Sequence, residues 1–173
     1  MSLSMSQLTI PVFVRALTQL SSILTKAEAY ATTKSIEPSV LIQSRLAPDM
    51  FPLVRQVQIA SDGVKGCVAR LAGIEIPSYA DTEASFAELQ ERIAKTVAFI
   101  KSVPAAQIDG SEGRSIIVKT HHQELHFEGL DYLTNFVLPN LYFHTTTAYA
   151  ILRHNGLDIG KKDYLGNVEK QAA

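Results

Sequence analysis

Four stretches of the chain carry apolar residues at steps of three and four, and this pattern constrains the fold more than any other feature of the sequence. Such spacing places the apolar side chains on one face of an α-helix. The first helix is predicted over residues 12–34. No strand pattern separates the first three stretches, so their apolar faces must bury one another. The sequence therefore predicts an all-α four-helix bundle.

The second and third helices have recognisable ends. Pro52 suits the first turn of the second helix, and Gly73 suits a left-handed cap at its end. Asp81 or Thr82 is predicted to cap the third helix, which Pro104 ends. The residues expected in the shared core are Leu17, Leu20, Leu24, Val57, Val64, Phe86, Leu89, Ile93, Leu141, Ala148 and Leu152.

Before the last helix the periodicity changes. Residues 115–120 and 124–128 read as two short strands across a polar turn, and in the second Leu125 and Phe127 alternate with His126 and Glu128, which predicts a small two-stranded β-hairpin. The last helix is predicted from about Pro139 to Asn155, with room for a short turn at 130–136 before it, and Gly156 suits its C-terminal cap. The hairpin is then an insertion in the bundle.

A length of 173 residues suits one domain with a substantial core. We therefore expect a single domain over 1–173, with the bundle at about 11–156. The tail at 157–173 begins with apolar residues and ends with polar ones, and we expect its last residues to be disordered.

Composition narrows the classes of function. Sixteen Lys and Arg against seventeen Asp and Glu leave a net charge of −1, without the basic excess of a nucleic-acid-binding protein. A lone cysteine, Cys67, cannot form an internal disulfide. We find neither a secretory signal pattern nor an apolar run of about 20 residues. The sequence predicts a cytoplasmic protein that binds neither nucleic acid nor membrane.

The histidines are the first candidates for chemistry. Within the last helix, His144 falls on the same face as apolar residues and so points inward. A buried histidine is most often a satisfied core residue, and the alternative is that His144 lines a cavity between helices. In the hairpin, His121, His122 and His126 are predicted to form a solvated face rather than a metal site.

A second polar stripe lies on an adjoining face of the last helix: Tyr142, Thr146, Tyr149 and Arg153. Phenol, hydroxyl and guanidinium groups at this spacing could bind an anion. They could also form a subunit contact, where Tyr and Arg are enriched, and we favour the contact. Cys67 lies among aliphatic residues of the second helix and is predicted to be a buried, unreactive thiol.

Two blocks of sequence resemble a known superfamily. RLAPDMFPLVRQVQ at 45–58 and LPNLYFHTTTAYAILRHNG at 138–156 look like an uncharacterised branch of the DinB/YfiT-like superfamily, whose members are a domain of unknown function. The similarity covers about residues 11–166. It implies a four-helix bundle, often dimeric, with three histidines that hold a divalent metal. Some members of the superfamily are thiol-dependent transferases or isomerases.

The resemblance also implies where those ligands would fall. His144 matches the second histidine of a pair on the last helix, while Asn140 stands at the first, and the third position is Gln58. Amide oxygens are weak ligands for zinc or nickel beside imidazole. The expected site is therefore degenerate, without a bound metal or other cofactor, and a polar trio of Gln58, Asn140 and His144 faces a cavity.

Two main functions compete. The first is a homodimeric, non-catalytic protein that binds a small polar ligand with this trio and with Tyr149 and Arg153. The second is a transferase or isomerase, metal-independent or using a divalent metal, with His144 as general base. Such an enzyme needs a second titratable group near His144, and the candidate is Asp62. A structural or partner-binding protein is the third possibility. A carboxylate beside His144 would favour the enzyme, whereas amides and aliphatic groups would favour the binding protein.

Overall fold

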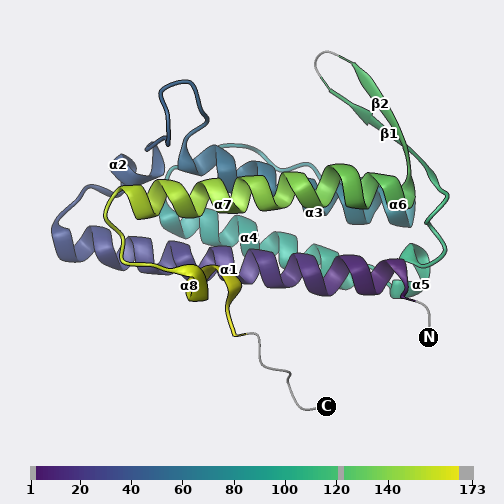
Figure 1. Ribbon diagram of the computed structural model, residues 1–173, viewed down its shortest axis with the longest axis horizontal. Coiled ribbons are helices and arrows are strands. Elements are labelled where there is room, and N and C mark those ends of the chain that lie inside the picture. Colours follow the sequence, from purple (N-terminus) through teal and green to yellow (C-terminus); the bar gives the residue numbers. More distant parts are fainter. Residues whose placement is uncertain (1–2, 121–122, 168–173) are drawn as a thin grey trace.

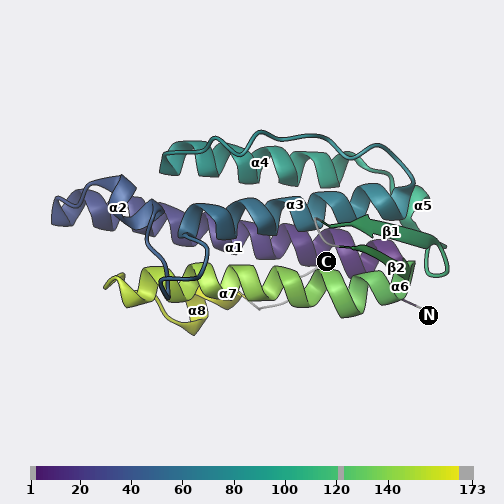
Figure 2. The same ribbon diagram turned by 90° about the horizontal axis from the view of Figure 1, so that it is seen from above.

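Four long helices lie side by side in a computed structural model, which describes residues 3–120 and 123–167 (Figures 1 and 2). They are α1 (Met5–Lys34), α3 (Leu53–Ala72), α4 (Phe86–Ser102) and α7 (Leu138–His154). Around the bundle, α1 packs on α4, α4 on α3, α3 on α7 and α7 on α1. The predicted all-α four-helix bundle is thus confirmed.

Short elements connect the long helices. An antiparallel hairpin pairs Ser115 with Glu128 and Lys119 with Glu124, and it precedes the last helix as predicted. The short elements are α2 (Pro38–Ile42), α5 (Ala105–Ile108), β1 (Ser115–Lys119), β2 (Glu124–Glu128), α6 (Gly129–Asp131), the π-helix η1 (Tyr132–Val137) and, after the last long helix, α8 (Lys161–Leu165).

The connection between α3 and α4 runs back along the bundle. α3 and α4 point in the same direction, so the extended segment 74–85 must return along the bundle before α4 can begin (Figures 1 and 2). Helices joined by a short loop would instead be antiparallel. This long crossover sets a strip of irregular chain beside α3 and α4.

The predicted core is confirmed. Every residue that the periodicity placed inside is at most 3% exposed, from Leu17 in α1 to Leu152 in α7. α1 is also long and apolar enough, by length and composition alone, to cross a membrane. A core helix of a bundle passes the same test, and the absence of a membrane segment stays a prediction.

Two helix starts differ from the sequence prediction. α1 begins at Met5, seven residues before the predicted start, because Ser4 and Gln7 form a capping box and the helix continues through Pro11. α4 is capped by Ser85, which forms a capping box with Glu88, and neither Asp81 nor Thr82 is the cap. In both cases a local Ser-x-x-Gln or Ser-x-x-Glu signal was the better guide.

The last α-helix, α7, starts at Leu138, within one residue of the prediction, but further helical turns precede it. α6, η1 and α7 follow one another without a break from Gly129, so Pro139 lies in the first turn of α7 and also within a longer helical run. Phe127 of the hairpin packs on Tyr132 and Phe136 of the π-helical turn, with ring centroids 5.7 and 5.4 Å apart. The hairpin thereby covers the beginning of this helix.

We predict that Ser85→Ala will destabilise the protein by about 1 kcal/mol, because it removes the side-chain oxygen that accepts from the Glu88 N–H. Thr82→Ala is the matched control, since Thr82 is exposed and does not cap α4. Urea unfolding followed by far-UV circular dichroism measures both. An equal loss in the two variants would contradict the assignment of the cap.

Candidate functional site

His144 lies between α7 and α3, where it is bonded to Gln56. The two side chains join His144 Nδ1 to Gln56 Oε1 at 2.7 Å, and both residues are buried. Gln56 Nε2 donates to the Phe51 carbonyl at 2.9 Å, which fixes the amide with its oxygen toward the ring. An amide oxygen can only accept, so Nδ1 carries the hydrogen. In the neutral ring, Nε2 therefore keeps its lone pair.

Burial also determines the charge of this ring. Desolvation lowers the pKa of His144 below the ordinary value of 6.5, because the charged imidazolium is less well solvated there. The Phe143 ring lies edge-on to the imidazole, with centroids 5.2 Å apart. His144 is therefore a neutral imidazole at neutral pH, oriented by one amide.

The predicted polar trio does not come together. Asn140 lies on the α3 side, since a Cβ placed on Gly63 would be 3.9 Å from Asn140 Nδ2. Gln58 bonds elsewhere: it accepts from Arg55 at 2.7 Å and donates to Glu83 at 2.7 Å. Helix positions i and i+2 are about 200° apart around the axis, so Gln58 lies nearly opposite Gln56. Gln56, not Gln58, is the residue of α3 that contacts His144.

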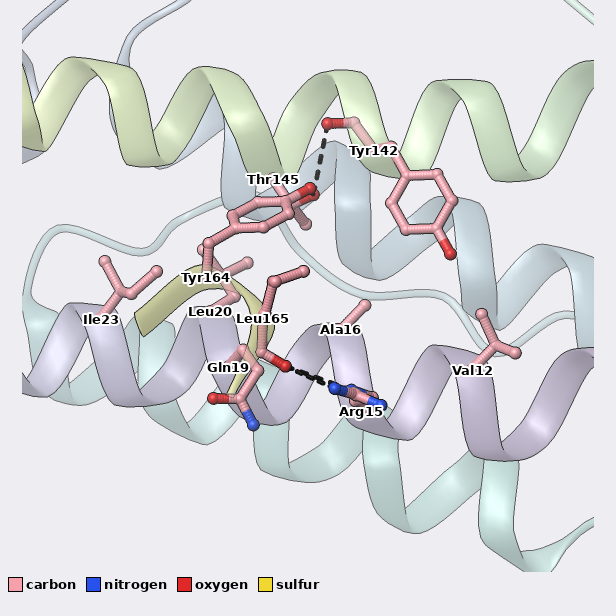
Figure 3. A pocket seen from close by; sticks show the side chains of 10 residues that line it. All are labelled: Val12, Arg15, Ala16, Gln19, Leu20, Ile23, Tyr142, Thr145, Tyr164 and Leu165. Carbon is pink, nitrogen blue, oxygen red and sulfur yellow. Dashed lines mark hydrogen bonds between the residues drawn. The ribbon is translucent and has the colours of Figure 1, made fainter. Parts of the chain in front are cut away.

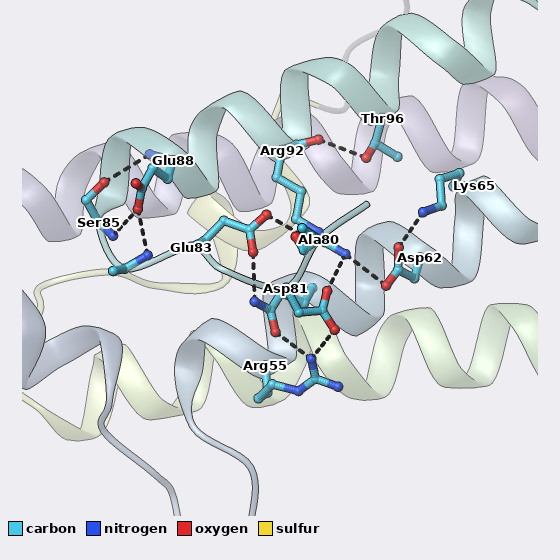
Figure 4. Close-up of polar contacts among 12 residues, drawn as sticks. Arg55, Asp62, Lys65, Ala80, Asp81, Glu83, Ser85, Glu88, Arg92 and Thr96 are labelled. Carbon is cyan, nitrogen blue, oxygen red and sulfur yellow. Dashed lines mark hydrogen bonds and ion pairs between the residues drawn. The ribbon is translucent and has the colours of Figure 1, made fainter. Parts of the chain in front are cut away.

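Asp62 belongs to the side of α3 that faces α4 (Figure 4). Its carboxylate pairs with Lys65 at 2.7 Å and with Arg92 at 2.8 Å, and both cations are buried. These contacts place it in the network between α3 and α4, whereas His144 contacts the Gln56 side. The second titratable group that the enzyme hypothesis requires is therefore not supplied by Asp62.

The same network ties the crossover to the bundle. Arg92 also pairs with Asp81 at 3.1 Å and with Glu83 at 2.8 Å, and both carboxylates belong to the segment 74–85 (Figure 4). Burial alone would raise the pKa of Glu83, but hydrogen bonds from Arg92 and Gln58 outweigh it and lower that pKa. These contacts hold an irregular strip of chain in place.

The polar stripe on the adjoining face of α7 contacts the chain that follows it, although Tyr142, Thr146 and Arg153 remain exposed. Tyr149 donates to the Ile159 carbonyl at 3.4 Å, and Arg153 donates to the Leu157 carbonyl at 3.3 Å. The Tyr164 hydroxyl lies 3.0 Å from the hydroxyls of both Thr145 and Thr146. Tyr149 and Arg153 thus position the segment that leads to α8.

α8 in turn forms one wall of an open cavity of about 360 Å³ between α1 and α7 (Figure 3). Its walls are mainly aliphatic side chains of α1 and two tyrosine rings, with a guanidinium and an amide among them. The lining residues are Val12, Arg15, Ala16, Gln19, Leu20, Ile23, Tyr142, Thr145, Tyr164 and Leu165. His144 is not among them, because it faces α3 while its neighbour Thr145 faces the cavity.

Comparisons with known proteins identify the family to which the chain belongs. A family model described as a domain of unknown function (DUF1993) matches residues 5–165. The chain belongs to the DUF1993 family. A crystal structure of a DinB family member from Shewanella denitrificans is similar over 97% of this chain and 95% of that one, at 42% identity and a TM-score of 0.87. These matches support the DinB-like assignment. A search of curated proteins finds no match.

The DinB-like assignment raises the question of a metal, and the residues of this DUF1993 chain do not fit one. Next to His144 lies an amide whose oxygen is already bonded to the ring, and Asn140 adds a second neutral amide. Within residues 3–120 and 123–167, no three His, Cys, Asp or Glu side chains are grouped closely enough to hold an ion. Zinc sites in proteins usually have at least three such ligands.

The other candidate residues contribute no chemistry that we can identify. Cys67 is fully buried, and desolvation raises the pKa of its thiol despite the nearby Arg70. His126 is exposed on the hairpin, and its Nε2 lies 3.9 Å from Glu124 Oε2. The predictions for His121 and His122, and for the disordered end of the chain, fall outside the described residues.

Sequence reasoning missed Gln56, Arg15 and Tyr164. Gln56 could have been found as the polar residue at the edge of an apolar helix face that also carries Pro52 and Leu53. Arg15 is a lone cation in an otherwise uncharged stretch of α1, from Met5 to Thr25, which was a usable signal. Tyr164 lies beyond the bundle among tail residues that the sequence indicates are packed, but its neighbourhood does not show which residues it contacts.

We predict that acid will destabilise this protein partly through His144. Since the folded state lowers its pKa, the unfolded state binds the proton more readily, so the stabilisation is complete above about pH 6.5 and is lost as pH falls below it. His144→Gln should flatten the change in unfolding free energy between about pH 7.5 and 5. His126→Gln, on the exposed hairpin, should leave that change intact. An unaltered pH profile in His144→Gln would rule out this linkage.

Proposed function

We propose that this protein binds a small molecule, without catalysis, in the cavity between α1, α7 and α8. The observation that carries the proposal is the cavity itself, whose volume of about 360 Å³ lies within the usual range of roughly 300–1,000 Å³ for ligand pockets. Aliphatic walls supply affinity for apolar groups, and the few polar groups at the edge select orientation.

The proposed ligand site differs from the one that the sequence predicted. Gln58 and Asn140 do not line it, and Tyr149 and Arg153 support it indirectly through the segment 157–165. The ligand is therefore mainly apolar with one polar end, in contrast to the small polar ligand expected from the trio. This binding requires no metal.

Among the residues that the structure describes, no carboxylate or second histidine is a hydrogen-bond partner of His144, and this supports binding over catalysis. A general base usually acts with a second titratable or electrophilic group within hydrogen-bond distance of the substrate. His144 contacts the Gln56 amide and the Phe143 ring, and Asp62 is held by Lys65 and Arg92.

One observation favours the alternative, an enzyme that uses His144. The Gln56 amide holds the imidazole as the tautomer whose Nε2 has a free lone pair, and burial keeps it neutral. A transferase or isomerase could use that nitrogen as a base. A ligand found beside Nε2, with the cavity empty, would favour this alternative.

Filling the cavity tests the proposal. Ala16→Phe places a ring among the lining residues, and we expect it to weaken binding of a neutral probe, indole, by about tenfold or more, since the ring occupies the probe's volume. Ala29→Phe is the control, because Ala29 is exposed on the same helix. Methyl NMR shifts of Leu20 and Ile23 report binding. Equal affinity in the two variants would overturn the proposed location.

We also propose a homodimer. Tyr149 is covered within the chain, so the surface that supports an interface is the exposed pair Tyr142 and Phe143, which are 45% and 56% exposed. Aromatic side chains are enriched in such contacts. Light scattering at micromolar protein should give twice the 18.9 kDa of one chain. A monomer mass for the wild-type protein, with no change in Phe143→Ser, would contradict the dimer.

A further inference from the structure

Arg15 is the charged group at the edge of the cavity, and its contacts leave it available to a ligand. Its Nε and Nη2 both donate to the Leu165 carbonyl, at 3.2 and 2.7 Å (Figure 3). A guanidinium has five N–H donors, and one carbonyl oxygen occupies two of them. In the part of the chain that the structure describes, no carboxylate forms an ion pair with Arg15.

The acidic residue of α8, Asp163, already has other partners and does not pair with Arg15. Asp163 pairs with Lys26 at 2.5 Å and accepts from the Gly160 N–H at 2.7 Å. Lys26 lies in the neighbouring hollow on the other side of α8 and does not line the cavity. α8 therefore satisfies one cation of α1 with a carboxylate and the other, Arg15, only with a neutral carbonyl.

Apart from Arg15, the Gln19 amide and the hydroxyls of Thr145 and the two tyrosines, the lining is aliphatic or aromatic. Val12 and Ala16 of α1 lie beside Arg15, and Leu20 and Ile23 continue the wall by one and two further turns. Such a surface gains affinity with each methylene group that it removes from water. A charge at the edge and a largely aliphatic wall along α1 match an amphiphile in which a carboxylate is joined to an unbranched chain.

We propose that the cavity binds aliphatic carboxylates, with Arg15 as the residue that selects the anion. This rests on the proposed function, and it adds the chemical class of the ligand. The carboxylate accepts from the Nη groups that the Leu165 carbonyl leaves open, and the hydrocarbon chain lies along α1. Arginine suits this role because its planar donors match a carboxylate with two parallel hydrogen bonds.

The test compares octanoate with octanol, which have the same chain length and differ in charge at one end. We expect the wild-type protein to bind octanoate about tenfold or more tightly, since a charge-assisted pair adds to the apolar contacts that both share. Higher salt should reduce the preference, because the pair lies at the protein surface. Isothermal titration calorimetry measures both affinities.

Arg15→Gln removes the charge but can still donate to the Leu165 carbonyl. It should lower octanoate affinity to that of octanol and leave octanol affinity unchanged. Arg15→Lys should keep part of the preference, as a point charge without the planar fork. Lys26→Met is the matched control, because it removes another cation that holds α8 without touching the cavity, and it should preserve the preference.

The outcomes separate this inference from the proposed function. Equal binding of octanoate and octanol by the wild-type protein, with indole still shifting the Leu20 and Ile23 signals, would overturn the carboxylate and leave the cavity as a binding site. A preference that Lys26→Met abolishes and Arg15→Gln preserves would overturn the role of Arg15. If octanoate, octanol and indole all fail to bind, both proposals fall.

Discussion

The structure depends on how α7 divides its inward surface between α3 and α1. α7 packs most extensively on α3, where His144 bonds to Gln56 and Asn140 lies near Gly63. Its contact with α1 is smaller, and α8 occupies part of the space that remains (Figure 1). Apolar side chains of two helices that do not fully meet leave a cavity, and here α8 forms one of its walls.

The polar contacts on the two sides of α3 differ in the chemistry that they allow. On the side toward α4, three carboxylates surround Arg92, and the result is a balanced network that holds the crossover. On the side toward α7, one amide orients one imidazole. The carboxylates that could have made His144 part of an acid–base pair are thus committed to the first network. We infer that the polar interior of this bundle specifies its shape, while the α1–α7 cavity provides the place for a ligand.

The fold could be predicted because helix periodicity depends on local sequence and on burial. Residues such as Leu17, Val64 and Leu152 repeat at helical steps, and the structure buries them all. Helix ends were harder to predict, since Ser85 and Ser4 act through short capping boxes that compete with other caps nearby. The start of α7 near Pro139 was predicted, whereas the π-helical turn that joins it to α6 was read only as a short turn at 130–136.

The site could be predicted only in part, for a geometrical reason. The inward direction of His144 followed from periodicity within one helix, whereas its partner required the rotation of α3 relative to α7. An error of two residues moved that partner from Gln56 to Gln58, on nearly the opposite side of α3. Arg15 and Tyr164 are almost 150 residues apart in sequence, and no local pattern joins them to one cavity.

The most direct test of the central claim is a crystal structure of the protein grown with an aliphatic carboxylate that carries bromine at the far end of its chain. Anomalous scattering locates the bromine without reference to the protein density. Our account predicts the bromine among Leu20 and Ile23 and the carboxylate beside Arg15. Bromine beside His144 Nε2, or a cavity that side chains fill completely, would contradict it.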